Sequence, residues 1–457
     1  MFETMILGAG PAGTGPLIRA AGAGLLGDWL DGGIAVVDRA AAMGGSLGRY
    51  TLNADTFGGT LLECLDAPAA PWLRALNDDP VVRTLAAGRD ALPPLPLVGR
   101  LLARLGTALT EEVARHGRSR FVREAQVIGL RLGRDGTVTA ELADRLGRRH
   151  CLQAASAVLA LGGRQRTNWQ DAALLPGISL HRWRHKLLPS DRLLTRGGEA
   201  FAEALLARGR APPRAVILGG SHSALSSAWM LLDRLARVRF AAAGLHILYR
   251  TEPRVFYASA AEALADGYRF APEDVCPATG RVHRLGGLRG DGRAVWRRIR
   301  GLDGSAGEQR AVAQPIGTLD PAGLAGLLDA ADLIVPAFGY RLATVPVIDP
   351  DGRRIALAET GPSVDAAARL RTATGGALAN VFGVGLGSGF RPWGGMAGEP
   401  NFQGQQNSLW LYQHGLGALL HDQVRGWAAE RRQRKRAARA WEEIAALYHA
   451  AAAPLPG

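Results

Sequence analysis

The sequence predicts an α/β protein with two parallel-sheet domains, the second inserted into the first. Three observations support this fold class. A glycine-rich turn joins an apolar strand to a helix near the N-terminus, at residues 5–26. A second turn of the same kind lies at 215–232, and a β-meander lies between them. A chain of 457 residues also exceeds what one hydrophobic core usually holds and fits two or three domains.

The composition is that of an ordinary globular protein, with 47% hydrophobic and 21% charged residues. The net charge of +13 comes almost entirely from arginine, because Lys186 and Lys435 are the only lysines. The arginines are scattered except for the run at 431–439, which we expect on the solvated face of an amphipathic helix. We therefore expect no nucleic-acid partner.

The N-terminus and the cysteines predict a reduced, cytoplasmic protein. Glu3 lies where a signal peptide would carry positive charge, and no apolar segment follows it. The sequence contains no stretch of about 18 uncharged apolar residues, so we expect no membrane span. Cys64, Cys151 and Cys276 lie far apart and offer no C-x-x-C pair, zinc spacing or disulfide framework.

The first glycine turn has the context of a Rossmann-like nucleotide site. A buried strand at 5–7 is followed at once by Gly8-x-Gly10-x-x-Gly13 and then by a helix. Gly8 allows the tight turn, Gly10 lets the backbone approach a pyrophosphate, and Gly13 lets helix and strand pack closely. The next strand, "IAVVDR", ends in Asp38, whose carboxylate can accept both hydroxyls of an adenosine ribose.

The second glycine turn, in "AVILGGSHSALSSAWMLL", begins at Gly219 and has Ser221 in place of the usual second glycine. The following strand, "LHILYRTEPR", carries Arg250 at its end, with Arg254 nearby, where an acid would bind the ribose of NADH. A guanidinium can instead form charge-assisted bonds to a 2′-phosphate, which favours NADPH. The alternative, that Arg250 is one more surface arginine, stays open.

The segments between and after these turns complete the layout of a flavoprotein that binds two dinucleotides. "AQVIGLRLGRDGTVTAEL" alternates apolar and polar residues around Arg134–Gly136, which predicts a hairpin. "ASAVLALGG" predicts a strand that ends at Gly162 and Gly163. We expect an FAD domain in residues 1–170, an inserted NADPH domain in 171–340, and a return segment with a C-terminal helix in 341–457.

One stretch of the sequence resembles a known family. Asp332 is followed by "LIV", Pro336 and then Ala337-Phe338-Gly339-Tyr340. This is similar to a motif of the NADPH-dependent flavoprotein monooxygenases, in the amine N-hydroxylating branch of lysine and ornithine N-hydroxylases. That motif has Leu or Phe, then Ala-Thr-Gly-Tyr, so Pro336 and Phe338 depart from it. The C-terminal stretch with His414-Gly-Leu also resembles that branch, whereas the segment 43–59 does not.

The resemblance implies a glutathione-reductase-like fold with two Rossmann-like domains that bind FAD and NADPH. It implies a monooxygenase that uses O₂ to N-hydroxylate a small amine or amino acid, through a flavin C4a-hydroperoxide shielded from water. A strand ending at Gly339 would return the chain to the FAD domain. Tyr340 would pack at this hinge or against cofactor, or else simply close a core. A homo-oligomer stays open.

Other chemistries fit the sequence less well. Disulfide reduction needs a cysteine pair beside the flavin, which this chain lacks, and the F-x-G-x-x-x-H signature of Baeyer–Villiger and general flavin monooxygenases is not visible. His181 and His185 have helical spacing but no third ligand, so we expect no metal. A Baeyer–Villiger or S-oxidising monooxygenase, or a simple reductase or oxidase, remains the alternative. A flavin-binding scaffold without turnover would have no use for the second turn.

We expect no catalytic side chain, because the cofactor carries out the oxygen chemistry. Asn401 or Asn407 could equally face the substrate. We expect cofactor contacts at the two glycine turns, in the loop after Asp38, at the arginines in the strand region after the second turn, at the hinge and in the C-terminal return loops. These residues are Gly8, Gly10, Pro11, Ala12, Gly13, Asp38, Arg39, Gly44, Gly45, Arg49, Asn53, Gly219, Ser221, His222, Ser223, Arg250, Arg254, Tyr340, Gly385, Gly387 and Gln403–Gln405.

Overall fold

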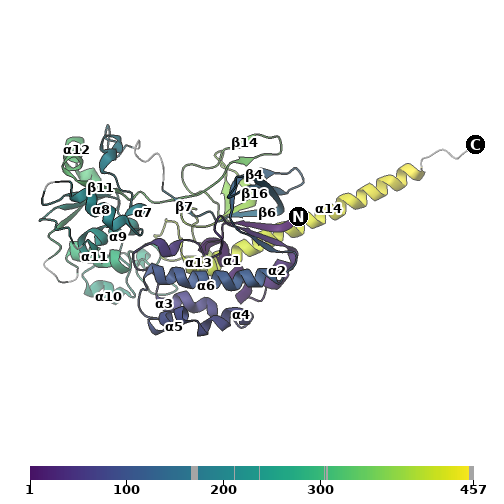
Figure 1. The fold of residues 1–457 in the computed structure, drawn as a ribbon, viewed down its shortest axis with the longest axis horizontal. Helices are drawn as coiled ribbons and strands as arrows, with labels where there is room; N and C mark the ends of the chain where they lie inside the picture. The colour runs from purple at the N-terminus through teal and green to yellow at the C-terminus, as the bar shows by residue number, and fades with distance from the viewer. Residues whose placement is uncertain (166–172, 210, 236, 303, 305–306, 452–457) are drawn as a thin grey trace, which may run out of the picture.

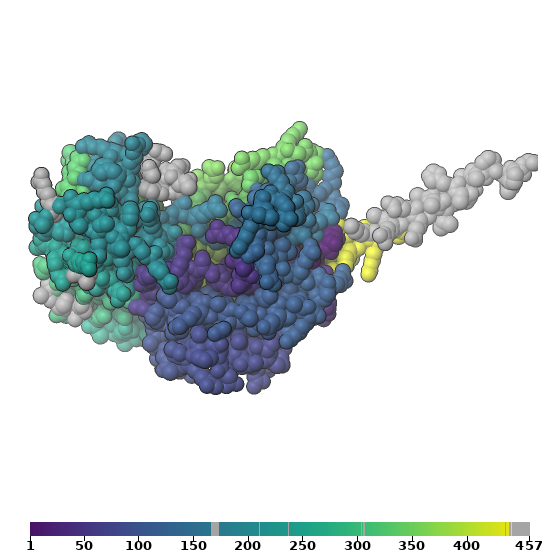
Figure 2. Space-filling view, viewed as in Figure 1, coloured from purple at the N-terminus to yellow at the C-terminus, as the bar shows by residue number. Residues whose placement is uncertain are grey.

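Two sheets organise the molecule, as the sequence predicts. The computed structural model describes residues 1–165, 173–209, 211–235, 237–302, 304 and 307–451. The part built on the larger sheet, here called the first domain, lies beside the inserted domain, which is built on the smaller sheet (Figure 1). In the space-filling view the teal inserted domain abuts the purple and blue segments of the first domain (Figure 2).

The first domain has a ten-stranded mixed sheet. Strand β1 (Phe2–Leu7) pairs in parallel with β2 (Ile34–Val37) on one side and with β6 (Arg149–Leu159) on the other. Residues 3–7 are buried throughout, which explains why this central strand is nearly continuous in apolar residues. The other strands are β3 (Arg120–Val122), β4 (Ala125–Leu132), β5 (Val138–Asp144), β13 (Val347–Ile348), β14 (Arg354–Ile355), β15 (Arg369–Arg371) and β16 (Ala377–Gly383).

The hairpin expected around Arg134–Gly136 is confirmed. Strands β4 and β5 are antiparallel, and Gly136 takes a φ of +73° in the turn between them. Helix α14 packs against α1 and β6. The helices of this domain are α1 (Pro11–Gly22), α2 (Leu26–Gly32), α3 (Gly58–Leu62), α4 (Pro71–Arg74), α5 (Pro80–Ala87), α6 (Leu95–Ala114), α13 (Leu409–Gln413) and α14 (Gly415–Ala451).

The inserted domain has a four-stranded parallel sheet in the order β10-β9-β8-β11. These strands are β8 (Ala215–Leu218), β9 (Leu245–Tyr249), β10 (Ala311–Pro315) and β11 (Leu333–Pro336). Helix α9 follows β8 directly and packs against α11. The helices here are α7 (Ser190–Leu193), α8 (Gly198–Leu206), α9 (His222–Trp229), α10 (Ala260–Ala265), α11 (Gly290–Arg300) and α12 (Pro321–Ala330).

The chain crosses between the two domains along two paired strands. Strand β7 (Gly163–Arg164) runs antiparallel to β12 (Arg341–Leu342), so the outgoing and returning segments lie side by side. The strand expected to end at Gly339 ends earlier, at Pro336. The reason is that β11 lies at the edge of its sheet, and Ala337 makes the last ladder contact, donating its N–H to the Leu218 carbonyl at 2.9 Å. Gly339, with φ of +76°, then turns the chain.

Each sheet has its own apolar core. The first core draws buried residues from 5–160 and 342–424, and the core around the smaller sheet draws them from 188–337. We therefore propose the division of the chain at 170/171 and 340/341. The first of these boundaries lies within 166–172, outside the described residues.

The arginine-rich run in α14 is only partly solvated, which corrects the expectation of a solvated face. Arg431 is 7% exposed and donates to the carboxylate of Asp135 at 2.7 Å. Arg425 and Arg432 both donate to the buried carboxylate of Glu3, at 3.0 and 2.9 Å. The sequence hides these contacts because the hairpin turn and the first strand present their acids to the helix only in the folded chain.

His181 and His185 are exposed on a short 3₁₀ helix, and within the described ranges no three His, Cys, Asp or Glu side chains form a metal-binding group. All three cysteines are free thiols. None of the helices in the described part of the chain combines the length and apolar character needed to cross a bilayer.

Replacing Glu3 by Gln should lower the free energy of unfolding by about 1–3 kcal/mol, because a neutral amide replaces the buried carboxylate that pairs with two arginines. Urea unfolding followed by circular dichroism measures the change. Glu359→Gln is the matched control, since Glu359 is exposed and has no ion pair among the described residues; its effect should stay within about 0.5 kcal/mol. Equal stability of Glu3→Gln and wild type would mean that these pairs do not anchor α14.

Candidate active site

The first glycine turn is closed by backbone contacts that leave no room for a side chain at Gly8 or at Gly13. Gly8 has a φ of +111°, and a Cβ atom there would lie 2.2 Å from the carbonyl oxygen of Ala160. A Cβ atom at Gly13 would lie 1.9 Å from the carbonyl oxygen of Gly8. The turn is therefore tight, and helix α1 lies close against the end of β1, as the sequence predicts.

A narrow gap lies between Gly10 and the loop that follows the second strand. The N–H of Gly44 donates to the carbonyl of Ala9 at 2.9 Å, which brings this loop onto the turn. A Cβ atom at Gly45 would lie 2.8 Å from the Cα atom of Gly10, whereas one at Gly10 would have 3.8 Å of clearance. No side chain caps α1, which starts at Pro11. An uncapped helix N-terminus beside two glycine backbones fits a pyrophosphate group.

Asp38 is held by the same turn. Its Oδ2 accepts the N–H of Ala9 at 2.6 Å, and its Oδ1 accepts the N–H of Ala40 at 2.7 Å. These bonds orient the carboxylate at the end of β2, next to the start of α1. The neighbouring Arg39 is exposed. The position suits a ribose contact, because carboxylate oxygens have lone pairs left for two hydroxyl donors.

The return loop after β16 joins the first turn to the crossing strand β12. A Cβ atom at Gly385 would lie 3.4 Å from the Cβ atom of Ala12, and one at Gly387 would lie 2.4 Å from the carbonyl carbon of Arg341. Gln405 holds this loop by accepting the N–H of Gly389 at 2.9 Å. Gly385 therefore lies at the start of α1, whereas Gly387 lies against β12 and Gln405 against Gly389.

The second glycine turn repeats this geometry in the inserted domain. A Cβ atom at Gly219 would lie 2.6 Å from the carbonyl oxygen of Ala337. Ser221 is the N-cap residue of α9, yet its side chain makes no capping hydrogen bond, and Ser223 lies in the first turn of the helix. Both glycine turns thus end in an uncapped helix, whereas Asp79, for example, caps α5.

The two candidate 2′-phosphate arginines lie in different surroundings. A Cβ atom at Gly220 would lie 2.7 Å from the Cβ of Tyr249 and 3.0 Å from the carbonyl oxygen of Thr251. Arg250, between these two residues, therefore lies beside the second turn; its guanidinium has no partner within the described part of the chain. Arg254 instead donates to the carbonyl of Asn401 at 3.4 Å, in the return segment.

His222, in the second turn, is surrounded by groups from both domains. Burial lowers its pKa; among its charged neighbours Asp55 raises the pKa and Arg289 lowers it. The net effect keeps the imidazole neutral near pH 7. Asp55 belongs to the segment 43–59, for which the sequence offered no parallel. The sequence indicated neither Asp55 nor Arg289 as part of the site, because they lie 167 and 67 residues from His222 in the chain.

Asp191 joins three segments at the hinge. Its Oδ1 accepts hydrogen bonds from the hydroxyls of Tyr50 and Tyr340, the latter at 3.0 Å. Its Oδ2 lies 3.2 Å from Nη2 of Arg49. Burial and the adjacent Tyr50 and Asp191 raise the pKa of Tyr340 far above its usual range, so its hydroxyl stays protonated. Tyr340 therefore packs at the hinge and does not simply close a core.

Two further contacts bind the first domain to the inserted domain. Asn53 donates its side-chain amide to Oδ1 of Asp291 at 3.0 Å. The buried carboxylate of Glu399 accepts the N–H groups of Leu285 and Gly286, each at 3.0 Å. Arg49 and Asn53, which we expected at the flavin, thus have partners in the inserted domain. No local pattern in the sequence pointed to Asp191, Asp291 or Glu399.

The two asparagines that could face the substrate also have protein partners. Asn401 donates to Oδ1 of Asp274 at 3.3 Å and, through its N–H, to the carbonyl of Glu273 at 3.0 Å. When the amide of Asn407 is oriented to satisfy its neighbours, its nitrogen donates to the carbonyl of Gly385 at 2.6 Å. Both therefore position the return segment.

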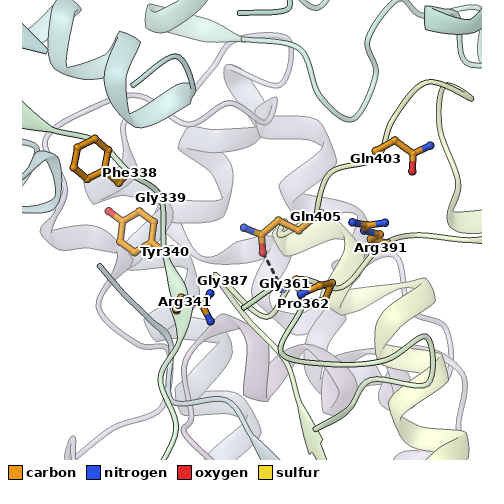
Figure 3. Close-up of a pocket in the computed structure, with 11 residues that line it drawn as sticks. Phe338, Gly339, Tyr340, Arg341, Gly361, Pro362, Gly387, Arg391, Gln403 and Gln405 are labelled. Atoms are coloured by element: carbon orange, nitrogen blue, oxygen red, sulfur yellow. Dashed lines mark hydrogen bonds between the residues drawn. The ribbon is translucent and has the colours of Figure 1, made fainter. Parts of the chain in front are cut away.

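A pocket of about 300 Å³ opens where the hinge meets the return loops (Figure 3). Its walls come from residues 338–341, the loop at 361–362, and the return segment between 387 and 405. In the close-up, Phe338 and Tyr340 lie on one side and Arg391 and Gln403 on the other, with Gln405 between them. The lining contains arginine, glutamine and aromatic side chains but no aspartate or glutamate.

Comparison with known proteins agrees with this geometry. No protein-family model matches the chain. A CMP-5′-(3-aminopropyl)phosphonate hydroxylase from Streptomyces rubellomurinus is 34% identical over 442 residues, which cover 92% of this chain and 96% of the relative. That identity over nearly the whole of both proteins shows a common family.

Solved structures of low sequence identity share the fold. A cadaverine monooxygenase from Erwinia amylovora, bound to FAD, is 14% identical with a TM-score of 0.54, covering 93% of this chain and 95% of its own. The L-lysine 6-monooxygenase from Pseudomonas syringae is 16% identical with a TM-score of 0.52, covering 93% and 100%. The ornithine N-hydroxylase from Kutzneria sp. 744 is 14% identical with a TM-score of 0.51, covering 95% and 100%.

The glycine turns, the hinge motif and these likenesses converge on one assignment. Two nucleotide turns, one with an acid and one with an arginine at the following strand, lie on two sheets joined by paired crossing strands. The relative is a hydroxylase, and the fold is that of FAD-binding monooxygenases. This chain belongs to the family of the CMP-5′-(3-aminopropyl)phosphonate hydroxylase, and it has the fold of flavoprotein monooxygenases that bind two dinucleotides.

Proposed function

We propose that this monooxygenase N-hydroxylates a primary amine at the end of a short aliphatic chain that also carries a phosphonate. The observation that supports this substrate class is the 34% identity, over 92% of the chain, to a CMP-5′-(3-aminopropyl)phosphonate hydroxylase. The amine would be converted to a hydroxylamine at the expense of NADPH and O₂. A screen that compares 3-aminopropylphosphonate with ornithine, lysine and cadaverine for hydroxylamine formation tests the proposal.

FAD would occupy the first glycine turn. The gap between Gly10 and Gly45 and the uncapped start of α1 would hold its pyrophosphate, and Asp38 would hold its adenosine ribose. The flavin end would extend towards the return loop at Gly385, which lies next to Ala12. FAD would supply the redox chemistry and the activation of oxygen; the protein would bind it, orient it and exclude water.

NADPH would occupy the second glycine turn. The uncapped start of α9 at Ser221 would hold the pyrophosphate, with His222 and Ser223 beside it. Arg250, whose guanidinium is free among the described residues, would bind the 2′-phosphate. The hydrogen bonds of Tyr50 to Asp191 and of Leu285 to Glu399 link the two domains that carry the two turns.

The proposed partners are therefore a small amine and O₂. We propose a cytoplasmic enzyme without a nucleic-acid or membrane partner, because the positive charge is scattered and many arginines are used in ion pairs such as Arg431–Asp135.

Replacing Gly10 by Val should remove FAD and spare the fold. Gly10 has a φ of −75° and the nearest atom to an added Cβ is 3.8 Å away, so a side chain fits the free protein and fills the pyrophosphate gap. We expect bound flavin, measured by its visible absorbance against protein, to fall to below about a tenth of the wild-type content. Gly27→Val is the control, because Gly27 lies in a helix with nothing within 4 Å of its Cβ position. A fully yellow Gly10→Val protein would contradict the assignment.

Replacing Arg250 by Gln should weaken NADPH far more than NADH. Loss of one charge-assisted bond to the 2′-phosphate is worth about 1.5–3 kcal/mol, or roughly a 10- to 100-fold rise in the NADPH KM. Arg269→Gln, at an exposed arginine of the same domain without a partner in the described residues, should leave both values unchanged. A parallel rise for both cofactors would mean that Arg250 does not contact the 2′-phosphate.

Turnover should rise with pH as the substrate amine loses its proton. Only the neutral amine has the lone pair that accepts oxygen, and aliphatic amines have a pKa near 10, so kcat/KM should rise about tenfold per unit from pH 6 to 9. Coupled assays of NADPH consumption and hydroxylamine formation measure this profile. A flat profile with undiminished hydroxylamine would show that the protein itself deprotonates the amine; NADPH use without hydroxylamine would indicate a reductase or oxidase.

A further inference from the structure

We infer that the pocket at the hinge binds the anionic phosphorus group of the substrate, with Arg391 as its charged contact. The inference rests on the proposed function and deepens it, because it assigns a place to the part of the substrate that is not oxidised. The phosphorus oxyanion could be the phosphonate itself or the phosphate of an attached nucleotide, and both present the same chemistry to an arginine.

The first support is the charge of the pocket lining. Arg341 and Arg391 both line the pocket, and none of its lining residues is acidic. A site built for an amino acid would need an acceptor for the α-ammonium group as well as a donor for the carboxylate. This lining offers donors and a net positive charge, which suits an anion.

The second support is the state of Arg391. It is exposed, and its guanidinium has no hydrogen-bond or ion-pair partner in the parts of the chain that the structure describes. Nearby, by contrast, Arg369 is paired with Asp365 at 2.8 Å. A guanidinium without a carboxylate partner keeps its planar set of N–H groups for a bidentate contact with a phosphorus oxyanion.

The third support is the arrangement of the neighbouring side chains. Gln405 uses its Oε1 to hold the N–H of Gly389, which leaves its amide nitrogen as a donor between the two walls of the pocket (Figure 3). Gln403 lies beside Arg391 on the same wall. Amide donors next to a guanidinium extend the set of groups that can contact oxyanion oxygens.

The opposite wall presents an aromatic ring. Phe338 is 37% exposed, which is unusual for a phenylalanine, and it stands where the family motif has threonine. A flat apolar ring facing a cationic wall suits a nucleotide, whose base can stack while its phosphate pairs with arginine. A volume of about 300 Å³ is at the lower end for ligand pockets, so it holds one such group and not a second dinucleotide.

The test compares Arg391→Gln with the wild-type, FAD-loaded enzyme by a selectivity ratio. This ratio is kcat/KM for 3-aminopropylphosphonate divided by kcat/KM for propylamine, which lacks the anion. We expect Arg391→Gln to lower the ratio roughly 10- to 100-fold, and Arg391→Lys to restore part of it, since lysine keeps the charge without the planar fork. General damage to the enzyme would lower both terms and leave the ratio unchanged.

Calorimetric titration of the same proteins supplies a readout that does not depend on turnover. CMP and 3-aminopropylphosphonate are titrated separately, so whichever Kd rises in Arg391→Gln identifies the source of the oxyanion. Phe338→Leu should weaken CMP alone, roughly 5- to 100-fold, if the base stacks on this ring. Arg353→Gln is the matched control, since Arg353 is exposed, lies outside the pocket and has no side-chain partner among the described residues.

Three outcomes would overturn the inference: neither ligand binds the wild-type enzyme, Arg391→Gln behaves like Arg353→Gln, or Arg391→Gln weakens only NADP⁺. Failure of the proposed function looks different. In that case no amine yields a hydroxylamine, yet an Arg391-dependent Kd for CMP or the aminoalkylphosphonate still supports the pocket as an oxyanion site.

Discussion

The carboxylate of Asp191 holds the two domains in the arrangement on which the candidate site depends. It accepts hydrogen bonds from Tyr50, in the loop after the second strand, and from Tyr340, at the returning hinge. A single half-buried acid thus joins three segments that are far apart in the sequence. Glu399 makes a second contact between the domains by accepting two backbone N–H groups of the inserted domain. The contacts of Asp191 and Glu399 together link the domain that carries the first glycine turn to the domain that carries the second.

The two glycine turns have similar backbone geometry and differ in the charge of the residue that follows the next strand. In both, glycine allows contacts with a neighbouring backbone that any side chain would block, as at Gly13 and Gly219. Both also leave the following helix uncapped, so its first N–H groups are available to phosphates. Asp38 directly follows β2, the strand after the first turn, and Arg250 directly follows β9, the strand after the second. Because the backbones are alike, the sign of this one charge separates the two proposed cofactors.

One departure from the family motif, Phe338, lies at the pocket that we propose for the substrate, whereas Pro336 ends strand β11. Phe338 replaces a threonine and presents its ring to the pocket, and Arg391 faces that pocket without a protein partner among the described residues. The first glycine turn keeps Gly8, Gly10 and Gly13, whereas the second has Ser221 in place of a glycine.

Local patterns were enough to predict the fold and the two nucleotide turns. Apolar strands, glycine spacing and the Arg134–Gly136 hairpin depend on neighbours in sequence, so they could be read without coordinates. Only the tertiary structure revealed Asp191 as the partner of Tyr340, and the anchoring of the C-terminal arginines on Glu3. It also brought residues 338–341 and 387–405 together into one pocket. These features join residues from distant parts of the chain, and no local spacing or periodicity encodes which distant side chain a folded carboxylate will meet.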